Sequence, residues 1–236
     1  NADWGVAVLM EVSTGDIKAI SNLEKSPSSD EYIEGMNRAV LGYEPGSVVK
    51  TLSMMIAVED GIVKDVDEVI TTGHGFAYAG GRPITDSHGV ASMPVREVIE
   101  RSSNIGMAKI ITSRYGDNPG AFYTRLKKLG FLDPMNTGIA GERPPRIDSV
   151  ASNRGGRIAL SRMCYGYSTE IPPLYTLSIY NAIANDGKYV RPRLVERLLG
   201  EGIDSVLPVS YVRATMACSP RTAATMRMPL TNAVRR

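Results

Sequence analysis

The stretch at residues 51–61, with the sequence TLSMMIAVEDG, places the strongest constraint on how this chain can fold. If the stretch is helical, its apolar side chains cover every side of the helix, and Gly61 ends the pattern. A helix that is apolar all round is stable only when other elements surround it. We therefore expect a central helix inside a substantial core.

The composition supplies enough apolar residues for such a core. Of the 236 residues, 43% are hydrophobic and 22% are charged, which is typical of a soluble globular protein of one domain or one and a half. The 27 basic and 25 acidic residues nearly balance, and the basic ones are scattered, so the charge pattern gives no indication of nucleic-acid binding. No apolar run reaches the roughly 18 residues of a membrane span.

The metal-binding residue types lack the spacing of a metal or redox site. Cys164 and Cys218 stand in unrelated contexts, and we expect two free, buried thiols rather than a disulfide. His74 and His88 have neither a nearby cysteine nor a histidine partner at helical spacing. We therefore assign no metal and expect His88, with Asp86, to brace the glycine-rich loop around it.

The order of the expected elements indicates an α+β domain with helices packed on an antiparallel sheet. Strands at residues 4–11 and 17–21 form a hairpin, and glycine-rich residues 71–89 form loops and short strands. The remaining segments are helices at 94–116 (interrupted at 102–106), 119–130, 172–187 and 219–234, a coil at 133–157 and a strand at 189–199.

A serine and a lysine just before the central helix carry possible chemistry. In the sequence GYEPGSVVKT, residues 42–51, Ser47 begins a helix and Lys50 lies about one turn further on the same face. Free N–H groups at a helix start can stabilise an oxyanion, and a partly desolvated lysine can take the proton of a serine. This arrangement fits acyl transfer.

Two other interpretations of the same residues are a helix cap and a phosphate loop. Ser47 could simply cap the helix while Lys50 reaches solvent, because Ser-x-x-Lys is common by chance. A phosphate loop is excluded, since it needs a lysine about six residues after its first glycine. Lys50 lies eight residues after Gly42.

A second group of polar residues, Ser102, Ser103 and Asn104, interrupts an apolar helical pattern. If the helix breaks there, the hydroxyl of Ser102 and the carboxamide of Asn104 can point into one cleft; alternatively, all three are caps between two helices. A Ser-x-x-Lys and a Ser-x-Asn about 50 residues apart match the motif set of the penicillin-binding proteins and serine β-lactamases.

Longer stretches in the same order strengthen this match. They are EPGSVVKT, ITDSHG, VIERSSNIGMAKI, AGERPP and YGYSTEIPPLYTLSIYNAIANDGKYVRPRLV. Over residues 4–196 the chain resembles the transpeptidase domain of class B penicillin-binding proteins, of the division or elongation type. The resemblance implies the penicillin-binding protein and serine β-lactamase-like fold over residues 1–236.

The resemblance implies a role for each motif residue. Ser47 would attack the penultimate D-alanine of a peptidoglycan stem peptide and form an acyl-enzyme. Lys50 would take and return protons, Ser102 would relay a proton to the amine, and Asn104 would hold the substrate amide and orient Lys50. β-Lactam antibiotics would acylate the same serine, with no cofactor. We expect three further substrate contacts: Gly46, Ser103 and Tyr167.

The chain departs from the family pattern at its third motif, Lys-Thr/Ser-Gly. The only Lys-Thr is Lys50-Thr51, which is followed by Leu52. In relatives the motif follows the segment that DGKYVRPRLV matches, so we expect the C-terminal sheet strands, a membrane anchor and a pedestal domain to lie outside these residues. We expect the 236 residues alone to show no transpeptidation and little or no β-lactam binding.

The implied partners are peptidoglycan stem peptides, β-lactams and a membrane glycosyltransferase, on the periplasmic or outer face of an anchoring bacterial membrane. Two other functions use the same fold, a β-lactam sensor domain and a serine β-lactamase. The β-lactamase is disfavoured because Glu142 stands in Glu-Arg-Pro-Pro-Arg, without the Glu-x-x-Leu-Asn pattern of a deacylating glutamate. We expect Glu142 to be structural.

Overall fold

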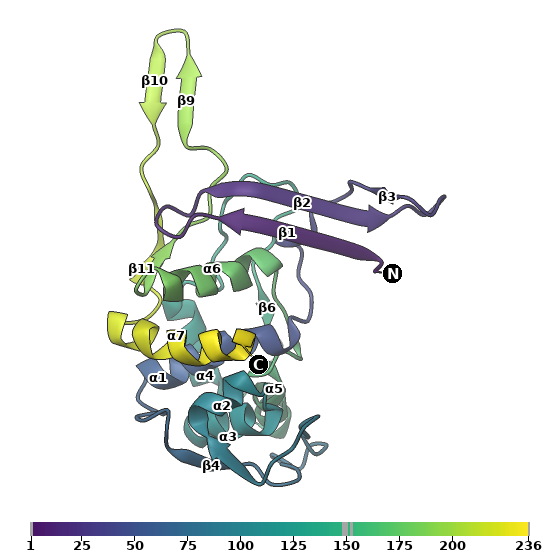
Figure 1. Ribbon diagram of the computed structural model, residues 1–236, viewed down its shortest axis with the longest axis vertical. Coiled ribbons are helices and arrows are strands. Elements are labelled where there is room, and N and C mark those ends of the chain that lie inside the picture. The colour runs from purple at the N-terminus through teal and green to yellow at the C-terminus, as the bar shows by residue number, and fades with distance from the viewer. Residues whose placement is uncertain (1, 148–150, 152, 236) are drawn as a thin grey trace.

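Helix α1 (Lys50–Glu59) lies at the centre of the computed structural model, which describes residues 2–147, 151 and 153–235. All side chains from Lys50 to Ala57 are buried, and α1 contacts α2 (Val95–Glu100), α3 (Asn104–Tyr115), α6 (Pro173–Ala184) and α7 (Pro220–Arg235). Figure 1 shows α1 enclosed by this helical body. The expected central helix is confirmed.

The chain begins with the expected hairpin. Strand β1 (Trp4–Met10) pairs antiparallel with β2 (Ile17–Lys25), which runs four residues beyond the predicted end and continues the sheet to β3 (Tyr32–Ile33). The turn of the hairpin is fastened to α6, because the Asn181 amide donates to the Val12 carbonyl at 3.0 Å. The sheet thereby lies along one side of the helical body (Figure 1).

Most predicted helices are confirmed, with shifts of a few residues at their ends. The pattern at residues 94–116 divides into α2 and α3, and α4 (Pro119–Leu129) ends at Gly130, which has a φ of 79°. Helices α6 and α7 match the last two predicted helices. The main hydrophobic core lies among these helices, with Met55, Ile56 and Ile111 fully buried.

The predicted coil at residues 133–157 is wrong at its C-terminal end. Helix α5 (Arg154–Met163) begins there, although its first residues include two glycines that hide the helical signal. Its start is fixed by Asn153, whose side chain accepts from the Gly156 N–H at 2.9 Å. Within the predicted coil, residues 148–150 and 152 lie outside the described residues.

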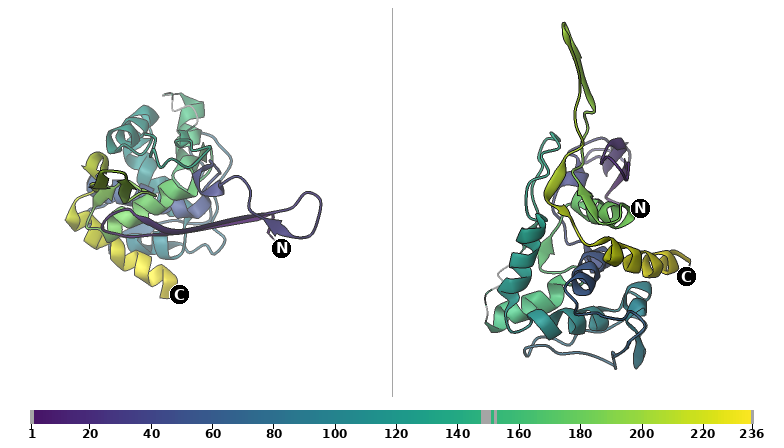
Figure 2. Two further views of the ribbon diagram at one scale, coloured as in Figure 1. Left: turned by 90° about the horizontal axis from the view of Figure 1, so that it is seen from above. Right: turned by 90° about the vertical axis from the view of Figure 1, so that its left-hand side faces the viewer.

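The predicted strand at residues 189–199 is also wrong, because it is two strands. Strand β8 (Lys188–Val190) stops before Pro192, which has no N–H for a ladder, and β9 (Arg197–Gly200) begins a new hairpin with β10 (Ile203–Val206). This hairpin projects far from the helical body in two perpendicular views (Figures 1 and 2). The chain then returns through β11 (Tyr211–Met216), which pairs with β8.

The strands of the described residues form several small antiparallel sheets. Besides β1-β2-β3, they pair as β4 (Val69–Thr71) with β5 (Ser92–Pro94) and β6 (Arg146–Ile147) with β7 (Thr169–Glu170), in addition to β8-β11 and β9-β10. The α+β class is confirmed. No helix in the described part of the chain is long and apolar enough to cross a bilayer.

A tight turn at residues 164–168 fastens α5 to the start of α1. The Gly46 N–H donates to the Gly166 carbonyl at 3.1 Å, the Ser168 N–H donates to Glu44 Oε1 at 3.1 Å, and the Ser53 hydroxyl donates to the Cys164 carbonyl at 2.9 Å. Gly166 has a φ of 104°, and a Cβ there would lie 2.0 Å from the Gly46 carbonyl oxygen. Only glycine permits this approach.

Truncation of the central helix should cost far more stability than truncation of the projecting hairpin. We expect Ile56→Ala to lower the free energy of unfolding by about 2–5 kcal/mol, because Ile56 is fully buried and its removal leaves a cavity. Leu199 is 74% exposed, so Leu199→Ala should change it by less than about 0.5 kcal/mol. Urea unfolding followed by circular dichroism measures both, and equal losses would contradict the proposed core.

The Gly166 contact can be tested against a glycine with similar backbone geometry and free space around it. Gly138 has a φ of 82°, and a Cβ there would meet nothing within 4 Å. Gly138→Ala should therefore cost only about 1–2 kcal/mol of backbone strain. Gly166→Ala should cost at least about 2 kcal/mol more in the same unfolding experiment, since it adds a steric clash. Similar losses for the two variants would show that the close approach does not exist.

Candidate active site

Ser47 lies at the start of the central helix, exposed to solvent. It belongs to a short 3-10 helix, Gly46–Val49, that runs directly into α1. Lys50 is the first residue of α1, and its side chain returns toward Ser47, with Nζ 3.0 Å from Ser47 Oγ. Ser47 is thus open to solvent, whereas Lys50, only 2% exposed, is buried.

Ser102 provides the other hydrogen-bond acceptors of the Lys50 amine. Lys50 Nζ donates to the Ser102 carbonyl at 2.7 Å and to Ser102 Oγ at 2.9 Å. Ser102 lies in the break between α2 and α3 with a φ of 55°, a left-handed conformation that is unusual for a residue other than glycine. Ser47 and Ser102 together accept hydrogen bonds from all three N–H groups of the protonated Lys50 amine.

Burial lowers the pKa of Lys50 from its ordinary value of 10.5 to about 8, and the nearby Asp86 and Cys164 act in the opposite direction. A buried amine loses the hydration that stabilises its charged form. A pKa near 8 leaves a substantial neutral fraction of Lys50 close to neutral pH. The neutral amine can accept a proton from Ser47, which an ordinary surface lysine could not do.

The side chain and the backbone of Asn104 are both bound by residues of the preceding loop. Its side-chain amide donates to the Thr85 carbonyl at 3.1 Å, and its backbone N–H donates to Asp86 Oδ1 at 2.6 Å. The hydrogen bonds that Lys50 makes in the described residues go to Ser47 and Ser102, and the expected role of Asn104 in orienting Lys50 stays a prediction. The half-buried Asn104 carboxamide still borders the same break as Ser102.

Ser103 does not have the role that we expected. Its side chain is 1% exposed, donates to Asp86 Oδ2 at 2.5 Å and accepts from the Gly106 N–H at 2.9 Å. These bonds make it the N-cap of α3. The expectation of a substrate contact is therefore wrong for Ser103, because its hydroxyl is buried and already occupied.

Gly46 and Tyr167 lie on the rim of the site. Gly46 has a φ of 61°, which directs the chain into the 3-10 helix that carries Ser47, and its N–H is used by Gly166. The Tyr167 ring is 48% exposed and contacts the Tyr165 ring, with centroids 5.6 Å apart. Tyr167 directly follows Gly166, whose carbonyl accepts from the Gly46 N–H, and its expected contact with substrate stays a prediction.

Two supporting residues were missed or only partly foreseen by the sequence analysis. Asp86, expected only to brace its loop, binds the first turn of α3 from 17 residues away in the chain. The Tyr180 hydroxyl accepts from Thr51 Oγ1 at 2.7 Å and donates to the Val48 carbonyl at 3.2 Å, which fastens the segment around Ser47 to α6. Neither contact has a local sequence signal, because each depends on long-range packing.

The remaining candidates of the sequence analysis make no hydrogen bond to Ser47 among the described residues. Glu142 accepts from the Asn136 N–H, the Thr137 N–H and the Thr137 hydroxyl, so its expected structural role is confirmed. Both cysteines are free and buried, as expected. Among the described residues, no group of three or more His, Cys, Asp or Glu side chains is placed to hold a metal ion.

Comparison with known proteins connects this geometry to a family. Residues 5–236 match the model of the penicillin-binding protein transpeptidase domain. The chain is 28% identical to penicillin-binding protein PbpB of Mycolicibacterium smegmatis over 98% of its own length and 36% of that protein. It is 28% identical to peptidoglycan D,D-transpeptidase FtsI of Escherichia coli over 91% of its length and 36% of that protein. The chain thus spans about a third of these curated relatives.

Solved structures show the same similarity. The chain superposes on penicillin-binding protein 3 of Mycobacterium tuberculosis, crystallised with aztreonam, with a TM-score of 0.81 and 27% identity over 98% of this chain and 52% of that one. The transpeptidase domain of penicillin-binding protein 3 from Burkholderia pseudomallei gives a TM-score of 0.76 and 26% identity over 98% and 62%. The resemblance to class B penicillin-binding proteins is confirmed. With a family match that spans residues 5–236, the chain belongs to the penicillin-binding protein transpeptidase domain family.

Proposed function

We propose that this chain carries the nucleophile of a serine D,D-transpeptidase that cross-links peptidoglycan stem peptides and is acylated by β-lactam antibiotics. The observation that carries the proposal is the buried Lys50 amine, which lies 3.0 Å from the Ser47 hydroxyl and 2.9 Å from the Ser102 hydroxyl. Family membership and the D,D-transpeptidase names of relatives support the substrate class.

The proposed reaction follows from these contacts. Neutral Lys50 takes the Ser47 proton as Ser47 Oγ bonds to the carbonyl carbon of the penultimate D-alanine. The proton then passes from Lys50 through the Ser102 hydroxyl to the leaving amine of the terminal D-alanine, and the acyl-enzyme remains on Ser47. The amine of a second stem peptide attacks the ester, loses a proton along the same path, and Ser47 recovers its own.

The exposed groups around the nucleophile support substrate roles on the same face. The N–H groups at the start of the helix lie beside Ser47, where they can stabilise the negative charge that develops on an attacked carbonyl oxygen. Asn104 and Tyr167 are the accessible polar and aromatic groups that we assign to holding the stem peptide. We also propose an extracytoplasmic location, with membrane anchoring and a glycosyltransferase partner, because the relatives are cell-wall enzymes.

One contact disfavours a β-lactamase as the alternative. Rapid hydrolysis of the acyl-enzyme needs a base that activates water, and Glu142 instead accepts bonds from Asn136 and Thr137. A β-lactam sensor that uses the same Ser47 and Lys50 is the remaining alternative. The lifetime of the acyl-enzyme separates the hydrolase from the other two functions, and cross-linking of stem peptides separates the transpeptidase from the sensor.

Replacement of the nucleophile should abolish acylation. In the gene product that contains this chain, a fluorescent penicillin should label the wild type, whereas Ser47→Ala should show no label, because the acylated atom is missing. Ser13→Ala, in the exposed hairpin turn, is the control and should label normally. Gel fluorescence and peptide mass spectrometry measure the label, and labelling at another residue would overturn the proposal. The 236 residues alone should label little or not at all, since they contain no Lys-Thr/Ser-Gly sequence.

The rate of acylation should depend on pH through Lys50. The pKa of Lys50 is about 8, and only its neutral form accepts the Ser47 proton, so the rate should rise as the pH increases through about 8 and level off above it. At pH 6 the rate should be about 100-fold below the plateau, since about 1% of the amine is neutral there. Stopped-flow acylation measures this profile. A rate that is constant from pH 6 to pH 9 would exclude Lys50 as the base.

A further inference from the structure

The loop that contains Asp86 binds the first turn of α3. Asp86 Oδ1 accepts from the backbone N–H groups of Asn104 at 2.6 Å and Ile105 at 3.1 Å, while Oδ2 accepts from the Ser103 hydroxyl at 2.5 Å. Ser103 Oγ in turn accepts from the Gly106 N–H at 2.9 Å. One carboxylate and one hydroxyl therefore satisfy three N–H groups at the start of α3, where a negative charge is also favoured by the helix dipole.

The residue next to this cap is the one that contacts Lys50. Ser102 is held on the side of α2 by its own N–H, which donates to the Ile99 carbonyl at 3.0 Å, and on the side of α3 by the residues that Asp86 binds. Its left-handed backbone is costly for a serine and persists only when both sides fix it. Release of one side would let Ser102 relax and move its carbonyl and hydroxyl away from Lys50.

We propose that Asp86 is a positioning residue for the reaction at Ser47, because its cap on α3 holds Ser102 against the Lys50 amine. This inference rests on the proposed function. Asp86 does not touch Ser47 or Lys50 through any hydrogen bond of the described residues; it acts through the Ser103 hydroxyl and the backbone N–H groups of Asn104 and Ile105.

The charge of Asp86 adds a second effect that a purely structural cap lacks. Asp86 and Cys164 are the titratable groups whose charges act on Lys50, and both raise its pKa against the effect of burial. Burial raises the pKa of the Cys164 thiol far above its ordinary value, so Cys164 stays neutral in the working range. The charge that Lys50 experiences is therefore mainly that of Asp86.

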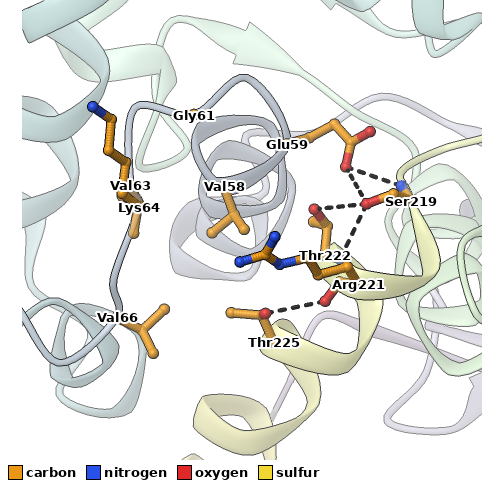
Figure 3. A pocket seen from close by; sticks show the side chains of 10 residues that line it. All are labelled: Val58, Glu59, Gly61, Val63, Lys64, Val66, Ser219, Arg221, Thr222 and Thr225. Atoms are coloured by element: carbon orange, nitrogen blue, oxygen red, sulfur yellow. Dashed lines mark hydrogen bonds between the residues drawn. The ribbon is translucent and has the colours of Figure 1, made fainter.

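The structure contains a matched control at the other end of α1. Glu59 accepts from the N–H and the hydroxyl of Ser219 at 2.9 Å each, and Ser219 Oγ accepts from the Thr222 N–H at 3.2 Å (Figure 3). This carboxylate and serine pair resembles the cap on α3 and lies at the start of α7, although Glu59 binds the N–H of the serine itself. Glu59 lies nine residues from Lys50 along α1, about 13 Å by the rise of a helix.

The experiment compares Asp86→Asn, Asp86→Ala and Glu59→Gln in the gene product that contains this chain, with the acylation rate by fluorescent penicillin measured from pH 6 to pH 10. In the plateau at high pH, Asp86→Ala should lose about 100-fold, because a displacement of about 1 Å at a reacting group has that effect. Asp86→Asn should lose about 10-fold, since its amide oxygen still accepts from the backbone. Glu59→Gln should stay within about 2-fold of the wild type.

The midpoint of the pH profile separates positioning from loss of fold. Removal of the negative charge in Asp86→Asn should move the midpoint to lower pH, whereas a loss of folded protein lowers the rate equally at every pH. Thermal unfolding measures the folded fraction of each variant. If Asp86→Ala does not fold, the plateau rate and the midpoint of the pH profile of Asp86→Asn decide whether the proposal holds. A wild-type plateau in Asp86→Asn, or an equal loss in Glu59→Gln, would overturn the proposal.

A second measurement keeps this test independent of the proposed function. Competitive labelling of lysine amines with acetic anhydride across pH, read by mass spectrometry, gives the pKa of Lys50 without acylation of Ser47. If penicillin does not label wild-type Ser47, the proposed function fails and the labelling still decides about Asp86. A lower Lys50 pKa in Asp86→Asn but not in Glu59→Gln supports the link between Asp86 and Lys50. An unchanged pKa refutes it.

Discussion

The burial of one lysine amine is the constraint on which the site depends. Lys50 is 2% exposed, and its amine donates to Ser47 Oγ, Ser102 Oγ and the Ser102 carbonyl. A buried cation without such partners would be costly, and with them its pKa is still lowered to about 8. The hydrogen bonds therefore make burial of the Lys50 amine tolerable. They do not cancel the effect of burial on its pKa, so the amine can still lose its proton.

The lowered pKa that makes Lys50 a candidate base also lowers the stability of the fold at neutral pH. The unfolded chain keeps Lys50 protonated up to its ordinary pKa of 10.5, whereas the folded chain releases the proton near pH 8. The unfolded state thus binds more protons between these values, and the contribution of Lys50 makes the folded state more stable as the pH rises through this interval. The left-handed backbone of Ser102 is a further strained feature of the same site.

The rest of the fold holds Ser47, Lys50 and Ser102 in their positions relative to one another. Helix α1 brings Lys50 into the core, the break between α2 and α3 presents Ser102, and the turn at Gly166 packs against Gly46, next to Ser47. These segments are far apart in the sequence and meet only because α1 is surrounded by other helices. A central apolar helix is therefore both the core of the molecule and the support of the proposed active site.

The sequence by itself determined the features that depend on local patterns. The hairpin, the central helix, the interrupted helix around Ser102 and the pairing of Ser47 with Lys50 follow from periodicity, turn residues and helical spacing. Local signals failed where glycines mask a helix, as at α5, and where a proline divides a strand, as at Pro192.

Only the tertiary structure decided how the second motif is used. Ser103 and Asn104 stand beside Ser102 in the sequence, yet Ser103 is a buried cap and the Asn104 amide is held by Thr85. Asp86, 17 residues before Ser103, determines this arrangement. A short polar motif specifies which groups are available, but which of them face Ser47 and Lys50 depends on the left-handed turn and on partners brought together by packing. That information is not local, so no pattern of neighbouring residues contains it.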